Sequence, residues 1–284
     1  MTAAVQPERA AAVAYRVDDA AFCYGPHRES VEGGTDGWAL RGLTFDVRDG
    51  EILGIIGPNG SGKSTLLKLL GSILSPHQGT IRLQERALDS FTGQELARIV
   101  AYVPQQSSVV FPFTLAEFVL MGRFPHRRTG GVLGGFGWET AEDVRAAGQA
   151  MEAMEIFHLA DRAISDVSGG ERQRAFIARA LAQAPRVLLL DEPTVFLDLR
   201  HQLDICAIMR RLNREQGLTV VWVSHDLNLA GQYCNRLLLL QDGALVRLGT
   251  PSTVLQPEVI ESVYRCPVLV DRHPASGAPR VTLP

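Results

Sequence analysis

The sequence predicts an α/β fold in which helices cover both faces of a parallel sheet. Three short runs are almost entirely apolar and end in turn residues, as is typical of strands that are buried on both sides. They are EILGII (51–56), VLLLD (187–191) and TVVWVS (219–224). Each run precedes residues that can begin a helix: the GKST stretch, Asp198 and Asp226. Strands and helices that alternate in this way form a layered core.

The bulk composition narrows the class of protein. A chain of 284 residues can bury a substantial core and has room for one or two domains. The formal charge of -3 offers no overall basic field, so general nucleic-acid binding is disfavoured. The four cysteines are far apart, without a CxxC pair, which indicates a reducing, cytosolic setting and no structural metal. The apolar runs fall short of the roughly 18 residues needed to span a bilayer, so we expect a soluble chain.

The two ends of the chain and its middle have different patterns. Residues 1–12 lack the basic start and apolar core of a signal peptide, and we expect a flexible tail. Between Gln105 and Ala184 the apolar spacing is helical, as in TLAEFVLMGR and AEDVRAAGQAMEAMEIFHL, with the turn-rich TGGVLGGFGW (129–138) between them. The pattern predicts a helical insert over about 106–184.

Two further features lie near the C-terminus. Asp242-Gly243 stands between two apolar runs, which predicts a β-hairpin at the edge of the sheet. From Pro267 onward the chain is rich in proline and poor in apolar residues, so we expect an extended tail that covers little of the core.

The stretch GPNGSGKST follows the first apolar run and matches the phosphate-loop pattern GxxxxGK[ST]. In this pattern, backbone N–H groups and a helix N-terminus bind phosphate oxygens, Lys63 reaches the β and γ phosphates, and the Ser64 hydroxyl is placed for Mg²⁺. The alternative is a chance glycine-rich turn, which the correct flanks oppose. The sequence therefore predicts nucleotide binding by Gly57, Pro58, Asn59, Gly60, Ser61, Gly62, Lys63, Ser64 and Thr65.

Two acids follow the run VLLL directly. Asp191-Glu192 looks like the second metal-and-water element of a phosphate-loop NTPase, in which Asp191 would hold Mg²⁺ and Glu192 would polarise the attacking water. Successive strand residues point to opposite sides, so the two carboxylates should have different roles. The alternative is a pair of solvated acids in a turn before Pro193.

Three more side chains are candidates for contact with the nucleotide. His225 follows the run VVWVS, which would bring it to the carboxyl edge of the sheet and the γ-phosphate, although a turn histidine is the alternative. Gln105, at the end of IVAYVPQ, could ligate Mg²⁺ and sense the γ-phosphate, or be an ordinary linker residue. Tyr24 could stack on the adenine, or be a core or surface tyrosine.

A second glycine-rich turn, VSGGERQR, also opens a helix. Ser168 and Glu171 have the spacing of a capping box, so a plain helix start is one interpretation. The turn nevertheless uses two glycines, Gly169 and Gly170, where one would be enough, and VLLLDEP follows its helix closely.

The order GPNGSGKST, VPQQ, VSGGERQR, VLLLDEPT, FLDL and VSHD resembles the ATP-binding cassette of ABC transporters over residues 13–249. This resemblance implies a P-loop NTPase (RecA-like) core with an antiparallel β subdomain and an inserted α-helical subdomain. It implies ATP and Mg²⁺ as cofactors, with Ser64, Gln105 and Asp191 at the metal. Residues 250–284 would form a C-terminal extension.

The resemblance also implies partners. Two cassettes of the family associate head to tail, so Ser168, Gly169, Gly170 and Glu171 would complete the site of a second copy, while Asp198 would communicate between the sites. The helical insert would contact a membrane subunit. Three features depart from the family pattern: Val167 in the signature, Val195 after the two acids, and the longer segment 27–38, which makes the role of Tyr24 less certain.

Several stretches narrow the resemblance further. FPFTLAEFVLMGRFPH, TVFLDLRHQLDI and VSHDLNLAGQYCNRLLLL look like ATP-binding subunits of importers for iron-siderophores, haem and vitamin B12. Integral membrane permease subunits, an extracytoplasmic substrate-binding protein and a peripheral position on the cytoplasmic side of the membrane would follow. The alternative is a non-transport ABC-type ATPase switch, either DNA-repair-like or regulatory. His126, His158, His201 and His273 form no ligand cluster by spacing and are interpreted as surface histidines.

Overall fold

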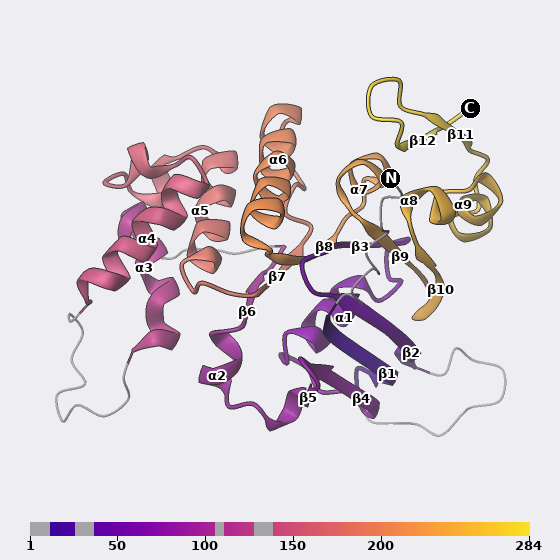
Figure 1. The fold of residues 1–284 in the computed structure, drawn as a ribbon. Helices are drawn as coiled ribbons and strands as arrows, with labels where there is room; N and C mark the ends of the chain where they lie inside the picture. The colour runs from indigo at the N-terminus through magenta and orange to yellow at the C-terminus, as the bar shows by residue number, and fades with distance from the viewer. Residues whose placement is uncertain (1–11, 26–36, 106–110, 128–138) are drawn as a thin grey trace, which may run out of the picture.

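The computed structural model describes residues 12–25, 37–105, 111–127 and 139–284. Its central feature is a sheet with the strand order β10-β9-β3-β8-β7-β6 (Figure 1). The five strands from β9 to β6 run parallel, and β10 pairs antiparallel with β9 at the edge. The strands are β3 (Ile52–Ile56), β6 (Val100–Val103), β7 (Val187–Asp191), β8 (Thr219–Val223), β9 (Arg236–Gln241) and β10 (Ala244–Gly249).

This sheet is buried on both faces, as the apolar runs predict. In β7, Leu188 and Leu190 pack into one apolar cluster, whereas Val187 and Leu189 pack into another. Alternate residues of a strand point to opposite faces of the sheet. Where helices cover both faces, every residue of the strand is therefore buried and apolar. The α/β layers and the expected hairpin at Asp242-Gly243 are both confirmed.

A second sheet is antiparallel and has the order β2-β1-β4-β5. Its inner face shares an apolar cluster with α1, the helix that follows the phosphate loop, and with one face of the central sheet. These elements lie together at the bottom of Figure 1. Their bounds are β1 (Val13–Cys23), β2 (Trp38–Arg48), α1 (Lys63–Leu70), β4 (Gln78–Leu83), β5 (Arg86–Ala87), the 3₁₀ turn Leu88–Ser90 and α2 (Gly93–Ala97).

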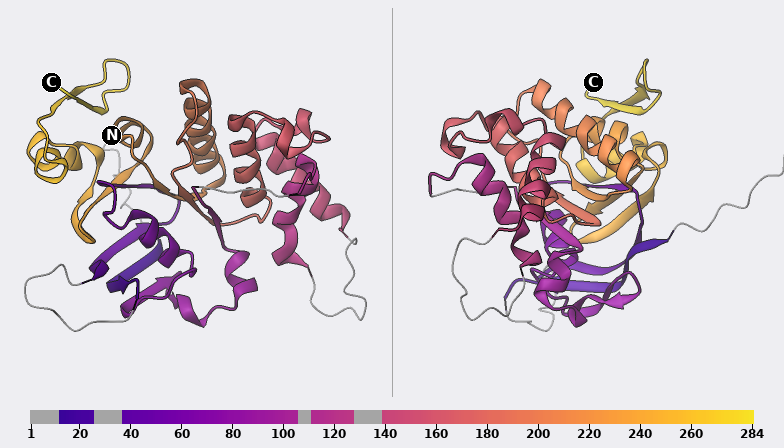
Figure 2. Two further views of the ribbon diagram at one scale, coloured as in Figure 1. Left: turned by 180° about the vertical axis from the view of Figure 1, so that it is seen from behind. Right: turned by 60° about the vertical axis from the view of Figure 1, so that its left-hand side comes forward.

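The elements between β6 and β7 are helical, in agreement with the expected insert. Helices α3, α4 and α5 pack against one another to one side of the central sheet, away from the antiparallel sheet (Figures 1 and 2). Arg123 is buried here and forms an ion pair with Asp143 at 2.9 Å. The bounds are α3 (Leu115–Leu120), α4 (Ala141–Ala153), α5 (Gly169–Leu181) and the 3₁₀ segments Met121–His126, Phe157–Leu159 and Ile164–Asp166.

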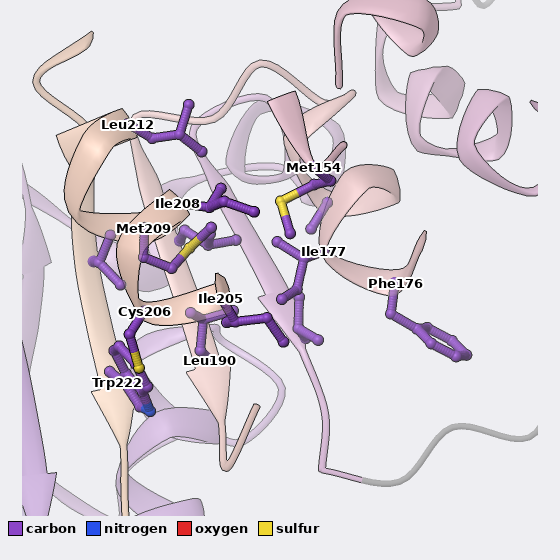
Figure 3. Close-up of a cluster of buried hydrophobic side chains, with 14 of the residues drawn as sticks. Met154, Phe176, Ile177, Leu190, Ile205, Cys206, Ile208, Met209, Leu212 and Trp222 are labelled. Carbon is purple, nitrogen blue, oxygen red and sulfur yellow. The ribbon is translucent and has the colours of Figure 1, made fainter. Parts of the chain in front are cut away.

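Helices α6 (Leu199–Gln216) and α7 (Leu227–Tyr233) begin at the two aspartates that the sequence indicates. The Asp198 carboxylate accepts from the backbone N–H of His201, and the Asp226 carboxylate accepts from Asn228 and Leu229. Helix α6 then lies across the central sheet. Figure 3 shows its apolar side chains, Ile205 and Met209 among them, between Leu190 of β7 and Ile177 of α5.

The C-terminal region differs from the expected extended tail. Residues beyond β10 form α8 (Pro251–Val254), α9 (Pro257–Tyr264) and a hairpin of β11 (Leu269–Arg272) and β12 (Pro279–Thr282). The hairpin packs against α7, where the Asn228 side chain donates to the Val281 carbonyl and accepts from its N–H. Val268 is buried against the core. Few apolar residues are enough because a hairpin satisfies its own backbone groups.

Three expectations lie wholly or mostly outside the described residues: residues 1–11 of the expected tail, residues 27–36 of the segment 27–38, and the whole turn-rich stretch 129–138. Among the described residues, no helix combines the length and the apolar character needed to cross a membrane.

Candidate functional site

The phosphate loop joins the end of β3 to the start of α1. The Lys63 ammonium lies inside the loop and donates to the carbonyls of Gly57 and Pro58, each at 2.9 Å. Gly62 has a φ of 99°, and a Cβ there would lie 2.7 Å from the Ala39 carbonyl oxygen. Only glycine therefore allows the chain to turn into α1 so close to β2. The loop is preformed around its lysine.

The first carboxylate of the pair lies next to the phosphate-loop serine. The Ser64 hydroxyl donates to an Asp191 oxygen at 2.9 Å, and the Tyr102 hydroxyl donates to the other oxygen at 3.2 Å. Asp191 ends β7 and is buried. Burial, followed by the neighbouring Asp191 charge, raises the pKa of Tyr102 well above its ordinary range, so its hydroxyl remains a donor. A hydroxyl and a carboxylate in contact form an oxygen donor set suited to Mg²⁺.

The second carboxylate faces a different pair of side chains. Glu192 has a left-handed backbone, with a φ of 51°, and its side chain has other partners than that of Asp191. Its carboxylate accepts from Gln105 Nε2 at 2.5 Å and contacts His225 Nε2. The two acids thus have different neighbours: Asp191 meets Ser64, and Glu192 meets Gln105 and His225.

The two acids also determine the electrostatics around the lysine. Burial lowers the pKa of Lys63, while the charges of Glu192 and Asp191 oppose that effect and raise it. The ammonium is therefore held in a partly desolvated position beside two carboxylates. An anionic ligand would gain from it more than from an exposed lysine, because the local dielectric is low.

Tyr24 lies at the edge of this site. The residue is 60% exposed, and its ring meets that of Phe22 edge-on, with ring centroids 4.9 Å apart. Its hydroxyl is 3.2 Å from the Thr65 hydroxyl on α1. The structure thus brings an exposed Tyr24 beside the phosphate loop, which suits the expected stacking on a base.

The second glycine-rich turn is a separate feature. Ser168 begins α5 with a complete capping box: its hydroxyl accepts from the Glu171 N–H, and the Glu171 carboxylate accepts from the Ser168 N–H at 2.8 Å. Within the described ranges, no hydrogen bond joins residues 168–171 to the phosphate loop. The structure of one chain therefore does not assemble both glycine-rich loops into one site.

Two residues near the site are missed by sequence reasoning. The signal for Tyr102 is a residue with a hydroxyl group inside an otherwise apolar strand, β6, which pairs with β7. His201 is interpreted as a surface histidine; its side chain is 27% exposed, and it also packs on Gly170 and contacts Asp198, which that interpretation does not foresee. The contact with Asp198 could have been predicted, because His201 lies three residues after this aspartate, which begins the helix.

A phosphate loop on a parallel sheet, with two acids at the end of a neighbouring strand, defines a phosphate-loop nucleotide hydrolase. The comparison with known families specifies the family. Residues 40–195 match the family described as ABC transporter. The chain belongs to this family of ATPases, and it binds ATP.

The relatives with the most similar sequences include importer subunits. The hemin import ATP-binding protein of Gloeobacter violaceus is 44% identical over 251 residues, which cover 86% of this chain and 88% of that protein. The ferric enterobactin transport ATP-binding protein of Escherichia coli K12 is 40% identical over 241 residues, which cover 84% of this chain and 86% of that protein.

Solved structures are similar over nearly the whole chain. One is a metal-chelate type ABC transporter in an inward-facing conformation, with a TM-score of 0.78 and 30% identity, over 95% of this chain and 97% of that one. Another is a dimeric ATP-binding cassette in a post-hydrolysis state with ADP and Pi, with a TM-score of 0.68 and 28% identity, over 84% of this chain and 98% of that one.

Proposed function

We propose that this chain is the ATP-hydrolysing subunit of an importer that takes up a metal chelate: haem, an iron-siderophore or cobalamin. The relatives described above are import subunits for hemin and for ferric enterobactin, and a similar solved structure is a metal-chelate type transporter. The observation that carries the ATP-hydrolysing part of the proposal is the grouping of Glu192 with Gln105 and His225, next to the pair Ser64 and Asp191.

The phosphate loop binds the nucleotide in this proposal. Lys63 exchanges its contacts with the Gly57 and Pro58 carbonyls for phosphate oxygens, so the loop need not refold when ATP binds. The N–H groups at the start of α1 point at the same position and stabilise negative charge. Tyr24 stacks on the adenine with its exposed ring.

Mg²⁺ fits the oxygen donors on the opposite side of the loop. Ser64 and Asp191, already 2.9 Å apart, would hold it, and the Gln105 amide oxygen would be the third protein ligand. When bound, the ion neutralises charge on the phosphate oxygens. Tyr102 holds Asp191 in place through its second carboxylate oxygen.

Glu192 acts as the general base in the hydrolysis step. It orients a water and accepts its proton, while His225 and Gln105 fix the carboxylate and contact the γ-phosphate. The left-handed backbone at Glu192 separates this carboxylate from Asp191, so one acid can serve the metal and the other the water.

A second copy of the chain completes each site. Ser168 and the N–H groups of Gly169 and Gly170 stand at the N-terminus of α5, which has 13 residues. In the part of the chain that the structure describes, no hydrogen bond joins them to the phosphate loop of their own chain. A head-to-tail dimer would place this loop on the partner's γ-phosphate. The helices α3 to α5 would meet a permease on the cytoplasmic face of the membrane, and a substrate-binding protein would deliver the chelate outside.

Three measurements test the proposal. The purified chain should hydrolyse ATP only when Mg²⁺ is present, and it should copurify with an integral membrane protein from solubilised membranes. Proteoliposomes that contain both should take up haem, an iron-siderophore or cobalamin when ATP is supplied. A chain that hydrolyses ATP but copurifies with no integral membrane protein would favour a non-transport switch, and a chain without ATPase activity would contradict the proposal.

A further inference from the structure

The first turn of α6 lies between two loops that have separate roles in the proposed function. One loop, residues 193–198, follows Glu192 and ends at Asp198. The other begins α5 at Ser168. His201, on the first turn of α6, contacts both loops.

The contact with the first loop is a pair of hydrogen bonds. The Asp198 carboxylate oxygen Oδ1 accepts from the His201 N–H at 2.9 Å and lies 2.8 Å from His201 Nδ1. Because a carboxylate can only accept, Nδ1 carries the proton. Gln202 holds the same loop from another side, donating to the carbonyls of Leu197 and Thr194 at 2.9 and 3.3 Å.

The contact with the second loop is one of close packing. A Cβ on Gly170 would lie 2.2 Å from His201 Cδ2, 2.5 Å from Cγ and 2.7 Å from Nε2. A Cβ on Gly169 would meet nothing within 4 Å. The two glycines therefore differ: Gly169 stands in open space, whereas Gly170 is the residue whose missing side chain makes room for the imidazole.

The contact between α5 and α6 continues in the next turn of both helices. Arg174, four residues after Gly170, is buried and donates to Asp204 at 2.5 Å, and Asp204 lies three residues after His201. Below this ion pair, Ile177 of α5 and Ile205 of α6 belong to one apolar cluster (Figure 3). Packed, paired helices move together rather than slide freely.

We propose that His201 is a positioning residue that joins the Ser168 loop to the 193–198 loop within one chain. The imidazole transmits a displacement of the Ser168 loop, through Asp198, to the segment that carries Glu192. A nucleotide bound in the partner's site contacts the Ser168 loop of this chain and thereby changes the position of this chain's own Glu192 carboxylate. This inference rests on the proposed function, because it assigns the Ser168 loop to the partner's nucleotide.

Two substitutions separate the two contacts. His201→Asn retains a side-chain donor near the Nδ1 position and loses the part of the ring that packs on Gly170. His201→Phe retains a ring on Gly170 and loses the donor to Asp198. If the imidazole is a bridge, each should lower kcat about tenfold, while the Kd for ATP of the monomer stays within about twofold of wild type. Arg214→Ala, exposed at the far end of α6, is the control and should keep the wild-type kcat.

The outcomes are distinct. A wild-type kcat in either His201 variant would overturn the bridge, since one contact alone would then be enough. Asp198→Ala combined with His201→Asn should be no slower than the slower single variant, and additive losses would likewise contradict a shared route. If the wild-type chain has no ATPase activity, the proposed function itself fails.

Thermal unfolding tests the packing independently of turnover. Gly170→Ala should lower Tm by about 5 °C in the wild-type background, because its Cβ overlaps the imidazole. In a His201→Ala background the same substitution should change Tm by about 1 °C or less, because the obstacle is gone. Equal losses in the two backgrounds would overturn the contact.

Discussion

The Ser64 hydroxyl donates a hydrogen bond of 2.9 Å to the Asp191 carboxylate, although the two residues are 127 positions apart in the chain. The bond joins the phosphate loop on α1 to the end of β7, two strands away from β3 in the central sheet. A parallel sheet brings the carboxyl ends of its strands to one edge, which is why residues so distant in sequence meet here.

Loss of this hydroxyl should weaken nucleotide binding only when Mg²⁺ is present. Ser64→Ala removes a metal ligand and the partner of Asp191, so the Kd for Mg-ATP should rise about tenfold, as expected for a bond to a charged group. The Kd for ATP in EDTA should change less than about twofold. Calorimetric titration with and without Mg²⁺ measures both, and Ser262→Ala on α9 is the control. An equal loss of affinity with Mg²⁺ and in EDTA would mean that the Ser64 hydroxyl contacts the phosphate rather than the metal.

The preformed loop around Lys63 leads to a second prediction. Lys63→Ala should raise the Kd for ATP by about 100-fold, since it removes a partly desolvated ammonium whose attraction for phosphate is strong at low dielectric. Lys68→Ala, on the last turn of the same helix, should leave the Kd unchanged. Fluorescence titration with a labelled ATP distinguishes them, and an unchanged Kd in Lys63→Ala would contradict the assignment of the phosphate loop.

A third prediction concerns the carboxylate that faces Gln105 and His225. Glu192→Gln keeps the size of the side chain and loses its basicity, so kcat should fall by about 10²- to 10⁴-fold while the Kd for ATP stays close to wild type. Because ATP then persists, light scattering after size-exclusion chromatography should detect a dimer in Mg-ATP. Glu258→Gln, exposed on α9, should behave as wild type. Normal turnover in Glu192→Gln would remove this residue from the mechanism.

The dimer of that variant provides a fourth measurement. Ser168→Ala, added to Glu192→Gln, should reduce the ATP-dependent dimer without changing the Kd for ATP of the monomer, because the Ser168 loop acts on the nucleotide of the partner. A weaker monomer Kd would mean that Ser168 belongs to the site of its own chain. An undiminished dimer would mean that the hydroxyl serves only to cap α5.

Local patterns in the sequence predict much of the fold and of the site. The continuous apolar run of β7, its terminal Asp191 and the phosphate loop are each recognisable without tertiary information, since strand burial and loop chemistry are local properties. The contact between Gln105 and Glu192 is not local, because it depends on the order in which β6 and β7 pair.

The same limit explains why His201 is missed. Its bond to Asp198 follows from local helix capping, but its packing on Gly170 needs the crossing of α5 and α6, which no short pattern encodes. The C-terminal hairpin is missed for another reason. Its few apolar residues suggest an extended tail, while its stability comes from backbone pairing and from contacts with Asn228 of α7.

Three of the described helices begin with a capping box, in which a Thr or Ser forms hydrogen bonds with a Glu three residues later. These glutamates make the stability of the fold depend on pH in the acid range. Hydrogen bonds lower the pKa of all three glutamates. For Glu95 and Glu117 the backbone N–H groups of Thr92 and Thr114 have the largest effect, followed by the hydroxyls of the same residues. For Glu171 the Ser168 hydroxyl has the largest effect, followed by the Ser168 backbone N–H. Each folded pKa lies below its ordinary value of 4.5. A carboxylate with a depressed pKa stabilises the fold above the unfolded value and loses this effect as pH falls through the folded value.

Wild-type Tm should therefore decrease as pH falls below about 4.5, in part through these three caps. The triple variant Glu95→Gln, Glu117→Gln and Glu171→Gln keeps a hydrogen-bonding side chain at each position but cannot ionise. It should unfold at a lower Tm than wild type at pH 7, and the difference should shrink as the pH is lowered toward 3.5. Scanning calorimetry at several pH values measures this. A constant difference in Tm would show that the charge of the capping carboxylates does not contribute to stability.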